Sequence, residues 1–225
     1  MLNNANIEEV QYLNELISDF PSQILDPVLA TTRIEFRYKQ LLSKSQQFLS
    51  LEQLQQKSFN PNQFVLGIQF YLYENILSNA GHYRSTKDKG GGSVFYGGVK
   101  QRSTEAQFSG AAPDSIPHFV NDSFLFLLSS DDISLDNALL FYRKFVRTHP
   151  FYDGNGRIAR LIVNSYLANE GISIDWSRIP HGKFLGKLNQ CHKVESDETL
   201  FKNYFALFVS FVSRFTVKID TSELE

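Results

Sequence analysis

The chain has 225 residues, 42% hydrophobic and 20% charged, and its 22 basic and 24 acidic residues give a formal net charge of -2 at pH 7. No Lys/Arg block stands out, which argues against nucleic acid or an anionic membrane as a partner. The one cysteine excludes an internal disulfide, and neither a leader-like start nor a bilayer-length apolar run is present, so we expect a cytoplasmic protein.

The first third of the chain carries apolar residues at the spacing of one helix face. This pattern predicts helices over residues 7–20, 28–42 and 62–79, and Pro27 suits the first turn of the second helix. Residues 51–56 are polar enough to form either a short helix or a connector, and the pattern does not decide between them.

Glycine and polar residues interrupt this periodicity in the middle of the chain. Residues 87–92 (KDKGGG) are predicted to be a solvated, flexible run, residues 93–96 a very short strand, and residues 101–117 a loop. Helical patterns then return over residues 120–128, 135–147, 156–169, 183–191 and 200–217. The fold class predicted from these elements is all-α with one small β element.

Residues 149–160 (HPFYDGNGRIAR) lie between two predicted helices, so they are expected to form a loop that leads into a helix N-terminus. Gly154 and Gly156 flank Asn155 and let backbone N–H groups turn toward one point, which makes a nest for an anion. The helix that begins there adds the positive end of its dipole, which favours phosphate.

Four charged or titratable side chains accompany this nest. Arg157 and Arg160 lie on one helical face and could hold a polyphosphate bidentately. Asp153 is placed to hold Mg²⁺ at phosphate oxygens, and His149 could deprotonate an incoming hydroxyl near neutral pH. Alone, each has an ordinary explanation as a helix cap, a dipole contact or a solvated face. Together, within one short segment, they favour phosphate or nucleotide binding.

The same segment resembles the signature of the Fic family, His-x-Phe-x-(Asp/Glu)-Gly-Asn-Gly-Arg-x-x-Arg, at every fixed position. Residues 82–84, 95–98 and 108–117 are similar to the stretch around the family's flap, and the resemblance covers about residues 28–210. It implies a Fic-type helical bundle with a small β-hairpin flap. It also implies an enzyme that moves AMP from ATP to a Ser, Thr or Tyr hydroxyl of a target protein.

The resemblance assigns a role to each residue of the segment. His149 would be the base that takes the proton from the target hydroxyl, and Asp153 would bind Mg²⁺ at the α- and β-phosphates. Gly154, Asn155 and Gly156 would form the anion hole. Arg157 would steady the phosphates, Arg160 would meet the γ-phosphate, and Phe151 would anchor the loop. The reaction would be in-line attack at the α-phosphorus with pyrophosphate leaving.

Val94, Phe95 and Tyr96 would form the flap, on which an extended target segment docks by strand addition. An ordinary surface hairpin is the alternative for these residues. The same resemblance extends to an inhibitory helix that carries (Ser/Thr)-x-x-x-Glu-(Gly/Asn), for which Thr31 and Glu35 have the required spacing.

By resemblance, Glu35 would pair with Arg160 and take the place of the γ-phosphate, so that ATP binds only unproductively. Phe36 departs from the family's Gly/Asn at the last position of this motif. The alternative is that Glu35 pairs with Lys39 on the helix surface, which is common and carries no function.

The predicted organisation is an N-terminal helical extension over residues 1–60 with an inhibitory helix at about 28–42, a catalytic core over 61–217 and a tail over 218–225. The expected partners are ATP and a target protein, with a homo-oligomer as a further possibility. Three alternatives stay open: removal of AMP or transfer of another nucleotide at the same site, a regulator that binds ATP without transfer, and a toxin-type role for the same chemistry.

Overall fold

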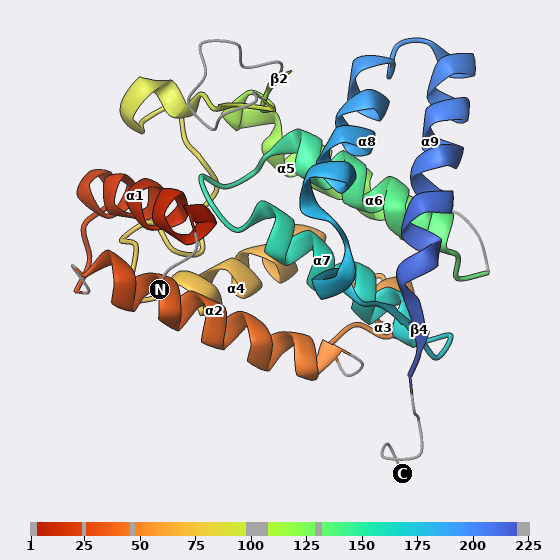
Figure 1. Ribbon diagram of the computed structural model, residues 1–225. Helices are drawn as coiled ribbons and strands as arrows, with labels where there is room; N and C mark the ends of the chain where they lie inside the picture. Colours follow the sequence, from red (N-terminus) through yellow and green to blue (C-terminus); the bar gives the residue numbers. More distant parts are fainter. Residues whose placement is uncertain (1–3, 24–25, 46–47, 98–107, 129–131, 220–225) are drawn as a thin grey trace.

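The structure is a computed structural model that describes residues 4–23, 26–45, 48–97, 108–128 and 132–219 (Figure 1). Helices dominate this part of the chain, so the all-α prediction is confirmed. The α-helices are α1 (Asn4–Asp19), α2 (Pro27–Ser43), α3 (Leu51–Gln55), α4 (Pro61–Tyr73), α5 (Ile116–Leu128), α6 (Leu135–Thr148), α7 (Asn155–Ala168), α8 (His181–Lys193) and α9 (Glu198–Val212). No helix in these ranges is long and apolar enough to cross a membrane.

Side-chain caps explain where several helices begin. Asp26 accepts a hydrogen bond from the Val28 N–H at the start of α2, and Asn60 caps α4 ahead of a proline at its first position. Ser50 and Gln53 form a capping box on α3, which settles residues 51–55 as a helix. Such caps satisfy N–H groups that have no partner within the helix.

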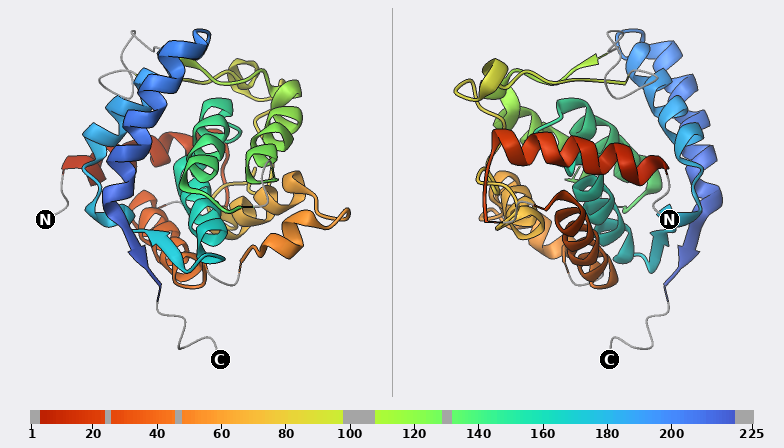
Figure 2. Two further views of the ribbon diagram at one scale, coloured as in Figure 1. Left: turned by 90° about the vertical axis from the view of Figure 1, so that its right-hand side faces the viewer. Right: turned by 60° about the vertical axis from the view of Figure 1, so that its left-hand side comes forward.

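Helix α7 lies in the middle of the bundle, with α2 and α4 on one side and α6 on the other (Figure 2). Most of its residues are buried, including the polar Asn155, Asn164 and Ser165. Helix α5 packs beside α6, α8 and α9 form an antiparallel pair over α6, and α1 crosses above α2 (Figure 1). Because most of α7 is buried, the loop that precedes it is attached to the core of the bundle.

Two small antiparallel sheets accompany the helices in the described part of the chain, where the sequence predicted one β element. Strands β1 (Phe95–Tyr96) and β2 (Phe108–Ser109) form the predicted flap. Strands β3 (Ile172–Ile174) and β4 (Thr216–Lys218) form the second sheet, so the predicted helix over 200–217 is too long and α9 ends at Val212. A pairing between residues this far apart leaves no local pattern in so short a segment.

Two further boundaries differ from the sequence prediction. Helix α4 ends at Tyr73, because Asn75 adopts a left-handed conformation (φ 62°) and turns the chain away. Helix α5 begins at Ile116 after a 3₁₀ turn, η3 (Pro113–Ser115), inside the predicted loop over 101–117. Residues 101–107 of that loop and residues 220–225 of the predicted tail lie outside the described residues.

The predicted flexible run over 87–92 also contains structure. Its end forms a 3₁₀ turn, η2 (Lys89–Gly92), with positive φ at its central glycines. The Lys89 ammonium lies 2.9 Å from the Asp19 carboxylate, which ties this turn to the end of α1.

Candidate active site

His149 is the C-cap of α6 and adopts a left-handed conformation (φ 51°, ψ 60°). This conformation is uncommon for a residue other than glycine, and it marks the start of the loop as strained. The imidazole stacks on the Tyr96 ring of β1, with centroids 4.7 Å apart. The Tyr96 hydroxyl in turn donates to the Arg147 carbonyl at 3.0 Å. The flap therefore fixes the orientation of the His149 ring.

Arg84 binds the backbone around His149 and is almost fully buried. Its Nε donates to the His149 carbonyl at 2.7 Å, and its Nη2 donates to the Ala111 carbonyl at 3.0 Å. Burial and, after it, the Arg84 charge lower the pKa of His149 to about 4, while Asp153 opposes the shift. The ring is therefore neutral at pH 7 and able to accept a proton.

The loop between α6 and α7 is closed by Asn155. Its amide Nδ2 donates to the Phe151 carbonyl at 2.8 Å, and its Oδ1 accepts from the Phe151 N–H at 3.0 Å. The Asn155 side chain is thus committed to the loop itself, and Phe151 is buried as expected. Gly154 precedes α7 with φ 87°, and a Cβ there would lie 2.9 Å from the Tyr73 ring. Only glycine fits at this position.

Arg157 collects three carboxylates in the first turn of α7. Its Nε donates to Glu35 of α2 at 3.2 Å, its Nη2 donates to Glu9 of α1, and its Nη1 lies 3.4 Å from Asp153. Burial alone would lower the pKa of Arg157, but the Tyr73 hydroxyl and these carboxylates raise it well above the usual range. Arg157 is therefore fully charged and surrounded by anions.

Arg160 lies one turn further along α7 and has neutral partners. Its Nε donates to the Tyr38 hydroxyl at 3.1 Å, and it also forms a hydrogen bond with Tyr142. The described residues include no carboxylate in an ion pair with it. The expected pair between Glu35 and Arg160 is thus not formed, because Arg157 lies opposite Glu35 while Arg160 meets Tyr38, one turn further along α2.

The remaining predicted residues lie near this centre. Thr31 is one turn before Glu35 and donates to the Pro27 carbonyl of its own helix at 2.8 Å. In the flap, the Val94 carbonyl accepts from the Gly110 N–H at 3.0 Å. Phe95 is 66% exposed and points away from the core, whereas Tyr96 faces the loop.

Asp153 carries a carboxylate, which is the kind of ligand that Mg²⁺ prefers. Its Oδ1 accepts from the Gly154 N–H at 2.7 Å, and the side chain is partly exposed. Within the described ranges, no three His, Cys, Asp or Glu side chains gather as a metal site. A single carboxylate suits Mg²⁺ that arrives with phosphate oxygens, which complete its shell.

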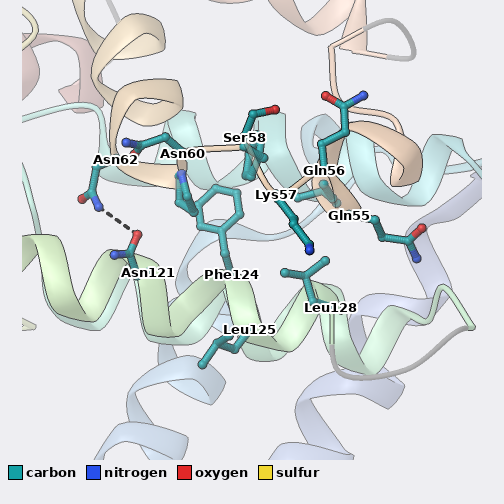
Figure 3. Close-up of a pocket in the computed structure, with 13 residues that line it drawn as sticks. Gln55, Gln56, Lys57, Ser58, Asn60, Asn62, Asn121, Phe124, Leu125 and Leu128 are labelled. Atoms are coloured by element: carbon teal, nitrogen blue, oxygen red, sulfur yellow. Dashed lines mark hydrogen bonds between the residues drawn. The ribbon is translucent and has the colours of Figure 1, made fainter.

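Two open hollows lie elsewhere on the surface. One, of about 710 Å³, lies between the α3–α4 connection and α5, where Asn62 Nδ2 donates to Asn121 Oδ1 at 2.8 Å (Figure 3). The other is lined in part by Arg84 and Asp88, behind the loop. Neither is lined by His149 or Arg157, and the arrangement of charged groups rather than a hollow defines the candidate site.

Sequence reasoning did not assign Glu9, Tyr73 or a role for Arg84. Glu9 and Tyr73 reach the loop from distant helices, so no spacing in the sequence signals them. Arg84 belongs to a stretch with a family resemblance, which was the one signal that could have pointed to it.

Comparisons with known proteins agree with this geometry. Residues 59–167 match the family model described as Fic/DOC family. A probable protein adenylyltransferase of Aquifex aeolicus is 25% identical over 127 residues, which cover 53% of this chain and 35% of that protein. The match therefore spans about a third of that relative's length.

Solved structures share the fold at low sequence identity. A Fic-domain-containing signaling protein from Bacteroides thetaiotaomicron has a TM-score of 0.57 at 20% identity, with 94% of this chain and 86% of that chain covered. The Bartonella tribocorum effector protein BepC, with bound AMPPNP, has a TM-score of 0.54 at 16% identity, with 88% and 90% covered. These likenesses confirm the Fic-type helical bundle with its flap.

Proposed function

We propose that this chain is a protein adenylyltransferase that moves AMP from ATP to a Ser, Thr or Tyr hydroxyl of a target protein, because residues 59–167 match the Fic/DOC family model. The observation that carries this proposal is the neutral His149, held between the flap and a helix N-terminus that bears Arg157 and Arg160. AMPPNP bound to the related BepC structure supports nucleotide as the ligand.

His149 acts as the general base. Its neutral imidazole takes the proton of the target hydroxyl, and the hydroxyl oxygen then attacks the α-phosphorus of ATP. The target oxygen forms a new bond to the α-phosphorus. The bond between the α-phosphorus and the oxygen that bridges to the β-phosphate breaks, and pyrophosphate leaves. The Tyr96 stack and the Arg84 hydrogen bonds keep the imidazole in one orientation, which favours this transfer.

The first turn of α7 and its arginines stabilise the phosphates. Backbone N–H groups of the first turn of α7, including that of Gly156, and the helix dipole favour negative charge there, while the Gly154 N–H already donates to Asp153 Oδ1. Arg160 is partly buried and, among the described residues, its hydrogen-bond partners are tyrosines, so its charge is available to a phosphate. Asp153 would hold Mg²⁺ together with phosphate oxygens, and that ion would neutralise charge on the leaving pyrophosphate.

Autoinhibition acts through Arg157. A phosphate that needs this guanidinium must displace carboxylates already bound to it, from Glu35 and from Glu9. Glu35 is therefore the inhibitory residue, and it acts on Arg157 rather than on Arg160. Phe95 at the exposed edge of β1 is the residue with which the flap would meet an extended target segment.

The experiment that tests the function uses the Glu35→Gly chain with a cell lysate, ATP and Mg²⁺, followed by peptide mass spectrometry. AMP attached to a Ser, Thr or Tyr residue of another protein, and absent when His149→Ala is added, is the expected result. Loss of AMP from an already modified protein would instead identify the reverse reaction. No AMP-modified peptide despite ATP binding would indicate a binding protein.

A further inference from the structure

The hydroxyl of Tyr73 lies inside the candidate site although the residue belongs to the core. Tyr73 is the last residue of α4 and is fully buried. Its hydroxyl accepts a hydrogen bond from Arg157 Nη1 at 3.2 Å and donates one to the Asp153 carboxylate. One neutral group therefore joins the predicted Mg²⁺ ligand to the arginine beside it.

The surroundings hold Tyr73 rigidly against the loop. Arg37 Nη1 donates to the carbonyls of Leu72 and Glu74, at 3.2 Å and 3.0 Å, on either side of Tyr73. The Tyr73 ring lies so close to Gly154 that no Cβ fits between them. The hydroxyl is thus delivered to one place by the fixed end of a helix.

Packing alone does not require this hydroxyl. Phenylalanine would fill the same space, and burying a hydroxyl is unfavourable unless its hydrogen bonds are made. The ordinary pKa of a tyrosine hydroxyl is about 10, so the phenol is neutral at pH 7. A neutral phenol can donate to a carboxylate and accept from a guanidinium at once.

We propose that Tyr73 is a positioning residue, which holds the Asp153 carboxylate and the Arg157 guanidinium in the orientation that receives Mg²⁺ and the nucleotide phosphates. The Gly154 N–H and the Tyr73 hydroxyl together fix the carboxylate and leave its other lone pairs for a cation. The hydroxyl also keeps Arg157 Nη1 in place when phosphate displaces Glu9 and Glu35. This inference rests on the proposed function.

Hydrogen-bond partners of a metal-binding carboxylate are worth about tenfold to a hundredfold in metal affinity. Tyr73→Phe removes the hydroxyl and keeps the ring, so it isolates this contribution. Tyr83→Phe is the matched control, because its hydroxyl donates to Asn62 Oδ1 at 2.8 Å while its ring packs on Phe151 of the same loop. Each variant loses one hydroxyl beside the loop, but of the two hydroxyls it is that of Tyr73 which contacts Asp153.

The test is isothermal titration calorimetry of ATP binding over a series of Mg²⁺ concentrations, with thermal unfolding measured in parallel. Tyr73→Phe should raise the Mg²⁺ concentration for half-maximal ATP affinity by about tenfold or more, and Tyr83→Phe should leave it within about twofold of wild type. An unchanged Mg²⁺ requirement in Tyr73→Phe, with or without a lower melting temperature, overturns the inference and leaves the proposed function standing. Wild-type protein that shows no Mg²⁺-dependent ATP binding overturns both.

Discussion

Acidification tests the proposed state of the catalytic base. Burial and the nearby Arg84 guanidinium lower the pKa of His149 to about 4, against an ordinary value of 6.5. A general base works in its neutral form, so a lowered pKa preserves activity toward acid pH. At pH 5.5 a histidine with a pKa of about 4 is about 97% neutral, whereas one of pKa 6.5 is about 9% neutral. The two cases differ by about tenfold in active enzyme.

The assay is kcat/KM for AMP transfer by the Glu35→Gly chain from pH 5 to 8, at constant free Mg²⁺. This ratio reports the ionisation of the free enzyme, which is the state that the structure describes. The value at pH 5.5 should stay within about twofold of the value at pH 7.5. A fall of about tenfold, with an apparent pKa near 6.5, would refute a buried neutral base at position 149. Unfolding curves at each pH separate loss of catalysis from loss of structure.

Four further substitutions have definite expected outcomes. Glu35→Gly should raise AMP transfer severalfold, and Glu9→Gln should raise it further, because each substitution removes a carboxylate from Arg157. Ion pairs of this kind are worth about 0.2–1 kcal/mol. Labelling rates that do not rise would contradict this prediction. Gly154→Ala should lower the unfolding free energy by about 1–3 kcal/mol, because φ is 87° and Tyr73 blocks a Cβ, whereas an unchanged denaturation midpoint would count against that packing. His192 is 3% exposed and neither ring nitrogen has a hydrogen-bond partner among the described residues, and burial together with Arg143 and Arg147 lowers its pKa to about 3. Below pH 6.5 the unfolded chain therefore protonates His192 while the folded chain does not, so the free energy of unfolding decreases as the pH is lowered, by about 2 kcal/mol at pH 5. Urea unfolding of His192→Leu should lack that part of the pH dependence, and a pH dependence identical to that of the wild type would contradict it.

Local patterns predicted much of this structure. Apolar periodicity and caps gave α1, α2, α6 and α7 to within a few residues, because these helices bury one continuous face. The end of α4 was missed because a left-handed Asn75 has no distinctive sequence signal. The β3–β4 sheet was missed because it joins segments that only the folded chain brings together.

The candidate site divides in the same way. The loop over 149–160 was predicted from its own residues and lies where the motif implied, between α6 and α7. The partner of Glu35 was not predictable, since the relative rotation of α2 and α7 decides which arginine it meets. Glu9 and Tyr73 were missed for a similar reason, because their contacts with Arg157 depend on tertiary packing.

The proposed function is tested most directly by paired labelling with ATP that carries label at either the α- or the γ-phosphate. Purified Glu35→Gly chain, with and without His149→Ala, is incubated with Mg²⁺ and lysate, and the label retained on denatured protein is measured. We predict retention of the α-label alone, and its loss when His149 is replaced. Retention of the γ-label would show phosphate transfer, and α-labelling that survives His149→Ala would contradict His149 as the base.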